Sequence, residues 1–88
     1  MSDERKTILV IARHNKPEAL RMASGLTLLD DQVEVAVIGE LGDDAETALQ
    51  MEALEFSEVP VVTLDPAQDA DLGRLADDML RADAVYVI

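Results

Sequence analysis

The chain has 88 residues, 49% of them hydrophobic, and carries 19 acidic side chains against 7 basic ones, for a formal net charge of −12. This length fits one small domain, residues 1–88, with a single core. The absence of cysteine excludes disulfides, thiolate metal sites and a cysteine nucleophile or persulfide carrier. The negative charge and the presence of only two aromatic residues, Phe56 and Tyr86, argue against nucleic-acid binding.

The first predicted element is the apolar, β-branched run Thr7–Ala12, which is typical of a strand covered on both faces in a parallel sheet. The run is too short for a signal-peptide core or a membrane span, so we expect a cytoplasmic protein without membrane contact. Asn15, followed three residues later by Glu18 and with Pro17 in the first turn, predicts the start of a helix. The apolar stripe of this helix consists of Ala19, Met22, Ala23, Leu26 and Leu29.

A second strand is predicted over residues 33–38, which are apolar except for Glu34 near the start. The helix after it is predicted to begin with Asp43 as its capping residue, because Glu46 follows three positions later. Its apolar positions continue at helical spacing to about Glu55.

A third strand is predicted over residues 59–64, where Pro60 is acceptable only near the beginning or along an unpaired side. The next helix has a regular apolar stripe that we expect to face the sheet, with charged residues filling the opposite face. The stripe is Leu72, Leu75, Ala76, Met79 and Leu80, and the charged face is Asp71, Arg74, Asp77, Asp78 and Arg81. A fourth strand is expected over residues 84–88.

This alternation of strands and helices predicts a three-layer α/β domain. We expect a four-stranded parallel sheet with right-handed crossovers, three helices on its two faces, and the flavodoxin-like strand order 2-1-3-4. One sheet edge and part of one face would stay uncovered in a monomer, so self-association is expected.

For this strand order, ligands would bind where strands 1 and 3 end. The loop after the first strand brings cations, the single histidine and a helix N-terminus to that point, which favours a small anion. The candidate ligand- or anion-binding residues are Arg13, His14, Asn15, Lys16, Thr63 and Asp65. The alternative is that Arg13 and Lys16 neutralise carboxylates such as Asp65 while His14 is an exposed loop residue.

The sequence argues against several other kinds of binding site. The chain has no glycine-rich phosphate loop, so dinucleotide, ATP and FMN binding are not expected, and neighbouring carboxylates without a histidine predict no metal site. We therefore expect no cofactor and assign no catalytic residue. The alternative is a small enzyme that uses His14 and Asp65 for acid–base chemistry on a small anionic metabolite.

The acidic residues are unevenly distributed: residues 1–21 carry three acidic and five basic groups, and residues 22–88 carry sixteen acidic and two basic ones. The net charges of +2 and −14 add up to the total of −12. Three explanations stay open for the acidic part, namely solubility, docking of a basic partner, and adaptation to salt.

Three segments, Glu18–Ala23, Gly25–Leu29 and Val33–Gly39, resemble the first helix and second strand of the DsrE/DsrF-like family. The resemblance implies a cytoplasmic α/β protein that forms trimers or hexamers and, in active members, passes sulfur as a cysteine persulfide. This chain has no cysteine, so no catalytic residue carries over. The leading hypothesis is a non-catalytic DsrE-like protein that binds a ligand or a protein partner as a subunit of a homo-oligomer, with sulfur metabolism as its expected context.

Overall fold

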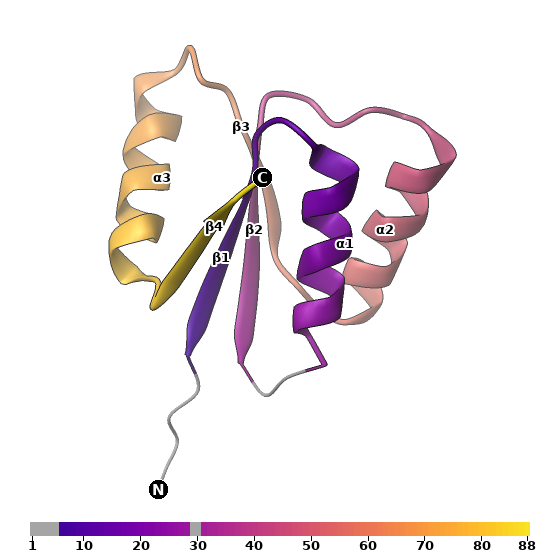
Figure 1. Ribbon diagram of the computed structural model, residues 1–88. Helices are drawn as coiled ribbons and strands as arrows, with labels where there is room; N and C mark the ends of the chain where they lie inside the picture. The colour runs from indigo at the N-terminus through magenta and orange to yellow at the C-terminus, as the bar shows by residue number, and fades with distance from the viewer. Residues whose placement is uncertain (1–5, 29–30) are drawn as a thin grey trace, which may run out of the picture.

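Strands and helices alternate along the chain and build one parallel sheet. The computed structural model describes residues 6–28 and 31–88. Its strands are β1 (Thr7–Ala12), β2 (Gln32–Ile38), β3 (Val61–Leu64) and β4 (Ala84–Val87), and every pair of neighbours is parallel (Figure 1). The predicted three-layer α/β fold, with a four-stranded parallel sheet and three helices, is confirmed.

The strand order is β3-β2-β1-β4, so the expected order 2-1-3-4 is wrong. The physical reason lies in the lengths of the strands. β1 and β2 are nearly all apolar and pair over six residues, which suits the centre of a sheet buried on both faces. β3 has only four residues and follows Pro60, which has no N–H to donate and therefore favours an edge strand.

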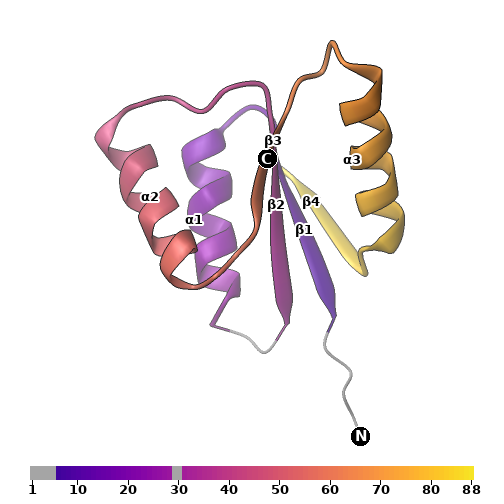
Figure 2. The same cartoon turned by 180° about the vertical axis from the view of Figure 1, so that it is seen from behind.

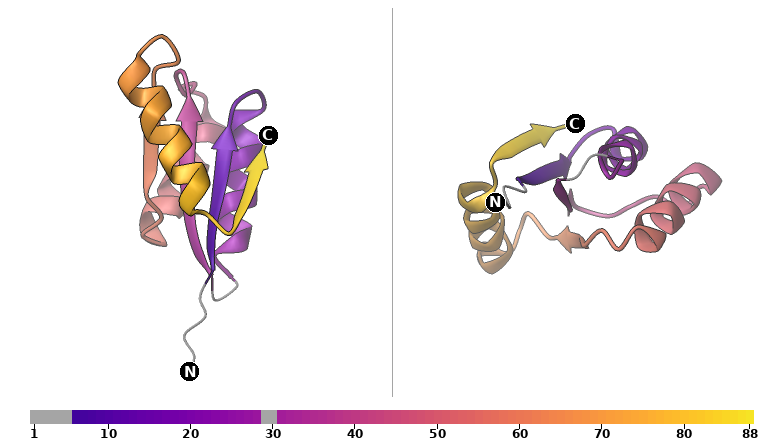
Figure 3. Two further views of the ribbon diagram at one scale, coloured as in Figure 1. Left: turned by 90° about the vertical axis from the view of Figure 1, so that its left-hand side faces the viewer. Right: turned by 90° about the horizontal axis from the view of Figure 1, so that it is seen from below.

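The three helices divide unequally between the two faces of the sheet. α1 (Lys16–Leu26) and α2 (Ala45–Phe56) pack against each other on one face, whereas α3 (Asp69–Arg81) lies by itself on the other (Figures 1 and 2). The view from below in Figure 3 shows α3 spanning the distance between the two edge strands, β3 and β4. None of the described helices has the length and apolar character needed to cross a membrane.

The start of α1 agrees with the prediction. Asn15 is the N-cap, and its side-chain Oδ1 accepts a hydrogen bond from the backbone N–H of Glu18 at 3.4 Å. The helix ends at Leu26, three residues before the predicted end of its apolar stripe. Leu29, the last expected position of that stripe, lies outside the described residues.

The start of α2 differs from the prediction by one residue. Asp44, and not Asp43, is the N-cap, because the Asp44 carboxylate accepts hydrogen bonds from both the backbone N–H and the hydroxyl of Thr47, at 3.1 and 2.7 Å. A threonine three positions after the cap provides two donors to one carboxylate. Glu46, which suggested Asp43 as the cap, lies instead in the first turn.

The core has two layers of different size, one on each face of the sheet. The layer beneath α1 and α2 is the larger one, and its fully buried large side chains are Val10, Leu20, Val35, Val37 and Leu54. The layer beneath α3 contains fewer buried residues, namely Leu9, Ile11, Ala36 and Leu64. α3 itself contributes no buried residue along Asp69–Arg81, so it covers its face of the sheet only loosely.

Candidate functional site

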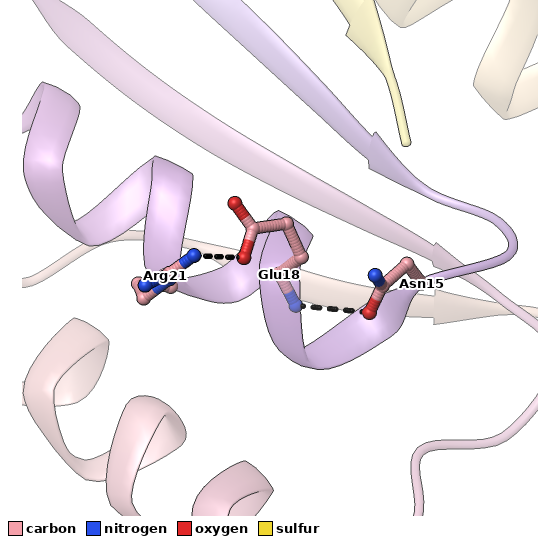
Figure 4. Close-up of polar contacts among 3 residues, drawn as sticks. All are labelled: Asn15, Glu18 and Arg21. Atoms are coloured by element: carbon pink, nitrogen blue, oxygen red, sulfur yellow. Dashed lines mark hydrogen bonds and ion pairs between the residues drawn. The ribbon is translucent and has the colours of Figure 1, made fainter.

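The loop between β1 and α1 is held against the end of β4. The backbone N–H groups of His14 and Asn15 both donate to the carbonyl oxygen of Ile88, at 2.9 and 3.2 Å. The side chain of Asn15 accepts from the Glu18 N–H (Figure 4), and Pro17 has no N–H. The N–H groups that we expected to attract an anion at this helix start are therefore largely engaged within the protein.

Two cations near this loop are also engaged. The ammonium group of Lys16 donates a hydrogen bond to the carbonyl oxygen of Glu40 at 2.8 Å, and Arg21 forms an ion pair with Glu18 on the exposed side of α1 (Figure 4). Gly39 lets the two loops approach closely, since its φ is +88° and a Cβ there would lie 3.3 Å from the Lys16 nitrogen. Lys16 therefore ties the β1–α1 loop to the β2–α2 loop.

Thr63 lies in β3 and Asp65 directly follows it, and β2 separates β3 from β1, after which His14 comes. Strands two positions apart in a sheet lie roughly 10 Å apart, too far for a direct hydrogen bond between their ends. Asp65 is engaged in its own turn, because its Oδ1 accepts from the Ala67 N–H at 2.9 Å and its backbone N–H donates to Asp71 Oδ2 at 2.8 Å. The expected meeting of strands 1 and 3 is wrong, and the predicted residues fall into separate places.

The carboxyl ends of β2 and β3 border a cavity of about 400 Å³. It is lined by Gly39, Glu40, Thr63, Leu64, Asp65 and Asp71. Half of these residues are acidic, yet the described part of the chain contains no group of three or more carboxylate or histidine side chains arranged to hold a metal ion. The side chains that line this cavity include no cation, and the nearest one, Lys16, is bonded to the carbonyl oxygen of Glu40 at its border.

Arg13 lies at a different cavity, of about 330 Å³, between the sheet and α3. Its apolar lining comes from three strands, from the loop between β3 and α3, and from α3, namely Ile11, Ile38, Pro66, Leu72, Leu75, Met79 and Val87. Arg13 is the one charged side chain among the described residues that line it, and this side chain is exposed. We refer to these eight residues as the Arg13 cavity.

The Arg13 cavity lies where the direction of the strand order reverses. β2 and β3 follow on one side of β1, and β4 lies on its other side. In open α/β sheets this reversal is the usual place for a ligand. The sequence identified Arg13 as a candidate, but not its apolar partners on α3, because Leu72, Leu75 and Met79 were expected to pack against the sheet.

A third cavity, of about 200 Å³, lies on the β3 side of α3. Its charged lining residues are Glu34, Arg74, Asp78 and Arg81. The Asp78 side chain is only 10% exposed and is paired with Arg81. Sequence reasoning placed Asp78 on the solvent side of the helix, and the structure places it toward the sheet.

The pKa of the Asp44 carboxyl is lowered from its usual value of 3.8, first by the hydrogen bond from the Thr47 hydroxyl and then by that from the Thr47 N–H. These bonds favour the ionised carboxylate because both donors point at its oxygen atoms. Asp44 lines none of the three cavities described above. The lowered pKa of Asp44 therefore reflects its role as the N-cap of α2 and does not indicate a ligand site.

Comparison with known proteins adds little to this geometry. No family model and no curated protein matches the sequence. Among solved structures, the chain is similar to the protein Rv1636 from Mycobacterium tuberculosis H37Rv, with 17% identity, coverage of 98% of this chain and 73% of that chain, and a TM-score of 0.48. A likeness of this degree carries no argument about function, and the DsrE/DsrF-like resemblance stays a prediction.

Proposed function

We propose that this protein is a non-catalytic binding subunit of a cytoplasmic homo-oligomer and that it takes a small organic anion in the Arg13 cavity. The observation that carries the proposal is the position of one exposed arginine at an otherwise apolar cavity, at the reversal point of the sheet. The acid group of the ligand would meet the guanidinium of Arg13, and its apolar body would lie against Leu72, Leu75 and Met79.

The size of the cavity limits the ligand. At about 330 Å³ it is near the lower end of small-molecule sites. A group the size of a water molecule fills roughly 30 Å³, so the cavity suits a body of roughly ten non-hydrogen atoms. A free inorganic anion would use Arg13 alone and would gain nothing from the apolar lining.

The net charge of the protein bears on which residue can bind the acid group of the ligand. With a net charge of −12, the surface as a whole repels anions, so an anionic ligand needs a local cation in addition to apolar contacts. Lys16 and Arg21 are held by Glu40 and Glu18, whereas Arg13 lies at the cavity. Arg13 is therefore the residue that we assign to the acid group.

Two further expectations from the sequence, a role in sulfur metabolism and an enzyme activity, bear on this proposal. The context of sulfur metabolism stays a prediction, and without cysteine any part in it would consist of binding and not of thiol transfer. The alternative enzyme, which uses His14 and Asp65, is not favoured by the geometry, because β2 separates the two residues.

Isothermal titration calorimetry with octanoate tests the proposal. Octanoate combines one carboxylate with an apolar chain of the right size, octanol has the same chain without the charge, and inorganic phosphate has charge without the chain. We expect octanoate to bind more tightly than either. Arg13→Gln should weaken octanoate about tenfold or more, because it removes a charge-assisted hydrogen bond.

Arg21→Gln is the matched control, since it removes the same charge from the exposed side of α1 and leaves the cavity untouched. It should leave octanoate binding unchanged, and Arg13→Gln should leave octanol binding unchanged. Equal affinity for octanoate and octanol, or an Arg13→Gln variant that binds octanoate as tightly as the wild type, would refute the assignment.

A further inference from the structure

The outer side of α2 presents two large apolar side chains to solvent. Leu49 is 63% exposed, and Phe56, the only phenylalanine of the chain, is 90% exposed. The two residues are seven positions apart, which is about two helical turns, so they lie within about 20° of each other around the helix axis. The buried residues of the same helix, Thr47 and Leu54, lie on the opposite side. Leu49 and Phe56 are therefore an apolar pair that points away from the core.

Acidic side chains flank this apolar pair. Successive residues of a helix are rotated by about 100°, so Glu46 and Glu52, three positions before and after Leu49, lie about 60° to either side of it. Both glutamates are exposed, and two further exposed glutamates lie close to Phe56 in the sequence. We refer to the following six residues as the α2 surface: Glu46, Leu49, Glu52, Glu55, Phe56 and Glu58.

We propose that the α2 surface binds a basic amphipathic helix of a partner protein. Apolar side chains of the partner would pack on Leu49 and Phe56, and lysine or arginine side chains beside them would meet the flanking glutamates. The spacing of the apolar pair fits a helix, because residues seven positions apart also recur on one side of the partner. The surface is separate from the Arg13 cavity, since α2 and α3 lie on opposite faces of the sheet (Figures 1 and 2).

The charge of this region selects the partner. Residues 43–58 contain six acidic side chains and no basic one. If a second copy of this chain brought its own α2 surface to this place, the same acids would meet, and like charges would oppose the contact. A membrane surface with anionic lipids would be repelled for the same reason. A cationic helix is attracted by the acids and covers the apolar pair, so it matches both features of the surface.

The apolar pair is large enough to anchor such a helix. If each side chain has roughly 200 Å² of surface, the exposed fractions of Leu49 and Phe56 amount to roughly 300 Å². This area is similar to that of the largest apolar patch on many monomeric proteins, and such patches often mark interaction sites. Aromatic side chains are enriched at protein interfaces, whereas Phe56 contributes almost nothing to the core of its own chain. We therefore expect a small interface and a transient complex.

Fluorescence anisotropy with a labelled peptide tests the proposal. The probe is a helix of about 18 residues that consists of leucine and lysine at amphipathic spacing. One control peptide has the same composition in an order without an apolar face, and the other has glutamate in place of lysine. We expect the leucine–lysine helix to bind at micromolar concentration in about 0.1 M NaCl and more weakly in about 1 M NaCl, because salt screens the charges. Both control peptides should bind about tenfold more weakly or less.

Substitutions on two helices locate the binding site. Phe56→Ala should weaken binding of the leucine–lysine helix about tenfold or more, because it removes the most exposed apolar side chain of α2. Leu80→Ala is the matched control, since Leu80 is 84% exposed on α3, and it should leave binding unchanged. Glu52→Gln should weaken binding in about 0.1 M NaCl and have little effect in about 1 M NaCl. Asp77→Asn changes the net charge equally at an exposed position of α3 and should have no effect.

Circular dichroism confirms that the variants are folded. Equal affinity of the wild type and Phe56→Ala for the leucine–lysine helix, or equal losses for Phe56→Ala and Leu80→Ala, would overturn the α2 surface as the site. Equal binding of the peptide without an apolar face would overturn the role of the apolar pair. Sedimentation velocity in which the wild type associates with itself and Phe56→Ala stays monomeric would assign the pair to a second copy instead. Octanoate binding is measured separately, so each of these results leaves the Arg13 cavity standing.

Discussion

Leu54 fixes α2 to the sheet, and its replacement by alanine gives the most direct test of the packing. Leu54 is 0% exposed and belongs to the larger core layer, and it is the one apolar side chain of Ala45–Phe56 that is fully buried. Leu54→Ala removes three carbon atoms, worth about 2.4 kcal/mol at about 0.8 kcal/mol each. It also leaves a cavity, which raises the expected loss to about 3 kcal/mol.

This loss is large for a domain of this size. A chain of 88 residues has a free energy of unfolding of about 4–13 kcal/mol, and a loss of about 3 kcal/mol would lower the melting temperature by roughly 12–24 °C. Urea denaturation followed by circular dichroism at the helix band measures the difference. The slope against urea should stay unchanged, because the variant unfolds the same surface.

Leu49→Ala is the matched control for this measurement. Leu49 lies on the same helix and is 63% exposed. The substitution therefore replaces one strong helix former with another and removes little buried surface. The expected change is within about 0.5 kcal/mol. A loss of less than about 1 kcal/mol for Leu54→Ala, or equal losses for the two variants, would show that Leu54 does not anchor α2 to the sheet.

Two further predictions concern loops and helix starts. The pKa of Asp44 is lowered in the folded protein, so its carboxylate stabilises the fold above its usual pKa of 3.8, and this contribution disappears as the pH falls through the lowered value. When the pH falls from above 3.8 to below the lowered pKa of Asp44, Asp44→Asn should therefore lose less stability than the wild type in urea titrations. Gly39→Ala should destabilise the protein by about 1 kcal/mol, because the φ of Gly39 is +88° and the added Cβ would press on Lys16. Gly25 lies in α1 with open space around it, so Gly25→Ala should stabilise the protein by about 0.5–1 kcal/mol. Thermal melts that show the same sign for both glycine variants would contradict this explanation.

The elements could be predicted from the sequence because their signals are local. An unbroken apolar run identified β1 at the residues where the structure has it, and the Asn15 cap identified the start of α1. The cap of α2 was misplaced because Asp43 and Asp44 are adjacent, and only the hydrogen bonds from Thr47 distinguish them.

The strand order and the rotation of α3 could not be predicted in the same way, because they depend on contacts between distant segments. The apolar spacing of α3 identified a helix, but it did not show that Asp71 and Asp78 would face the sheet. Asp71 is held there because its carboxylate accepts a hydrogen bond from the N–H of Asp65 at the end of β3. Asp78 lies on the same side of the helix and pairs with Arg81 one turn further on. For the candidate site, the position of Arg13 could be predicted because it directly follows β1. Its apolar surroundings could not, because they depend on the strand order.

The acidic surface opposes self-association, and this opposition depends on the salt concentration. Two chains that each carry −12 repel one another, so a dimer held by apolar side chains tightens as salt screens the charges. A basic partner docked on acidic residues would instead dissociate in salt, because screening removes the attraction that holds it. The direction in which salt shifts association therefore distinguishes docking of a basic partner from self-association of this acidic chain.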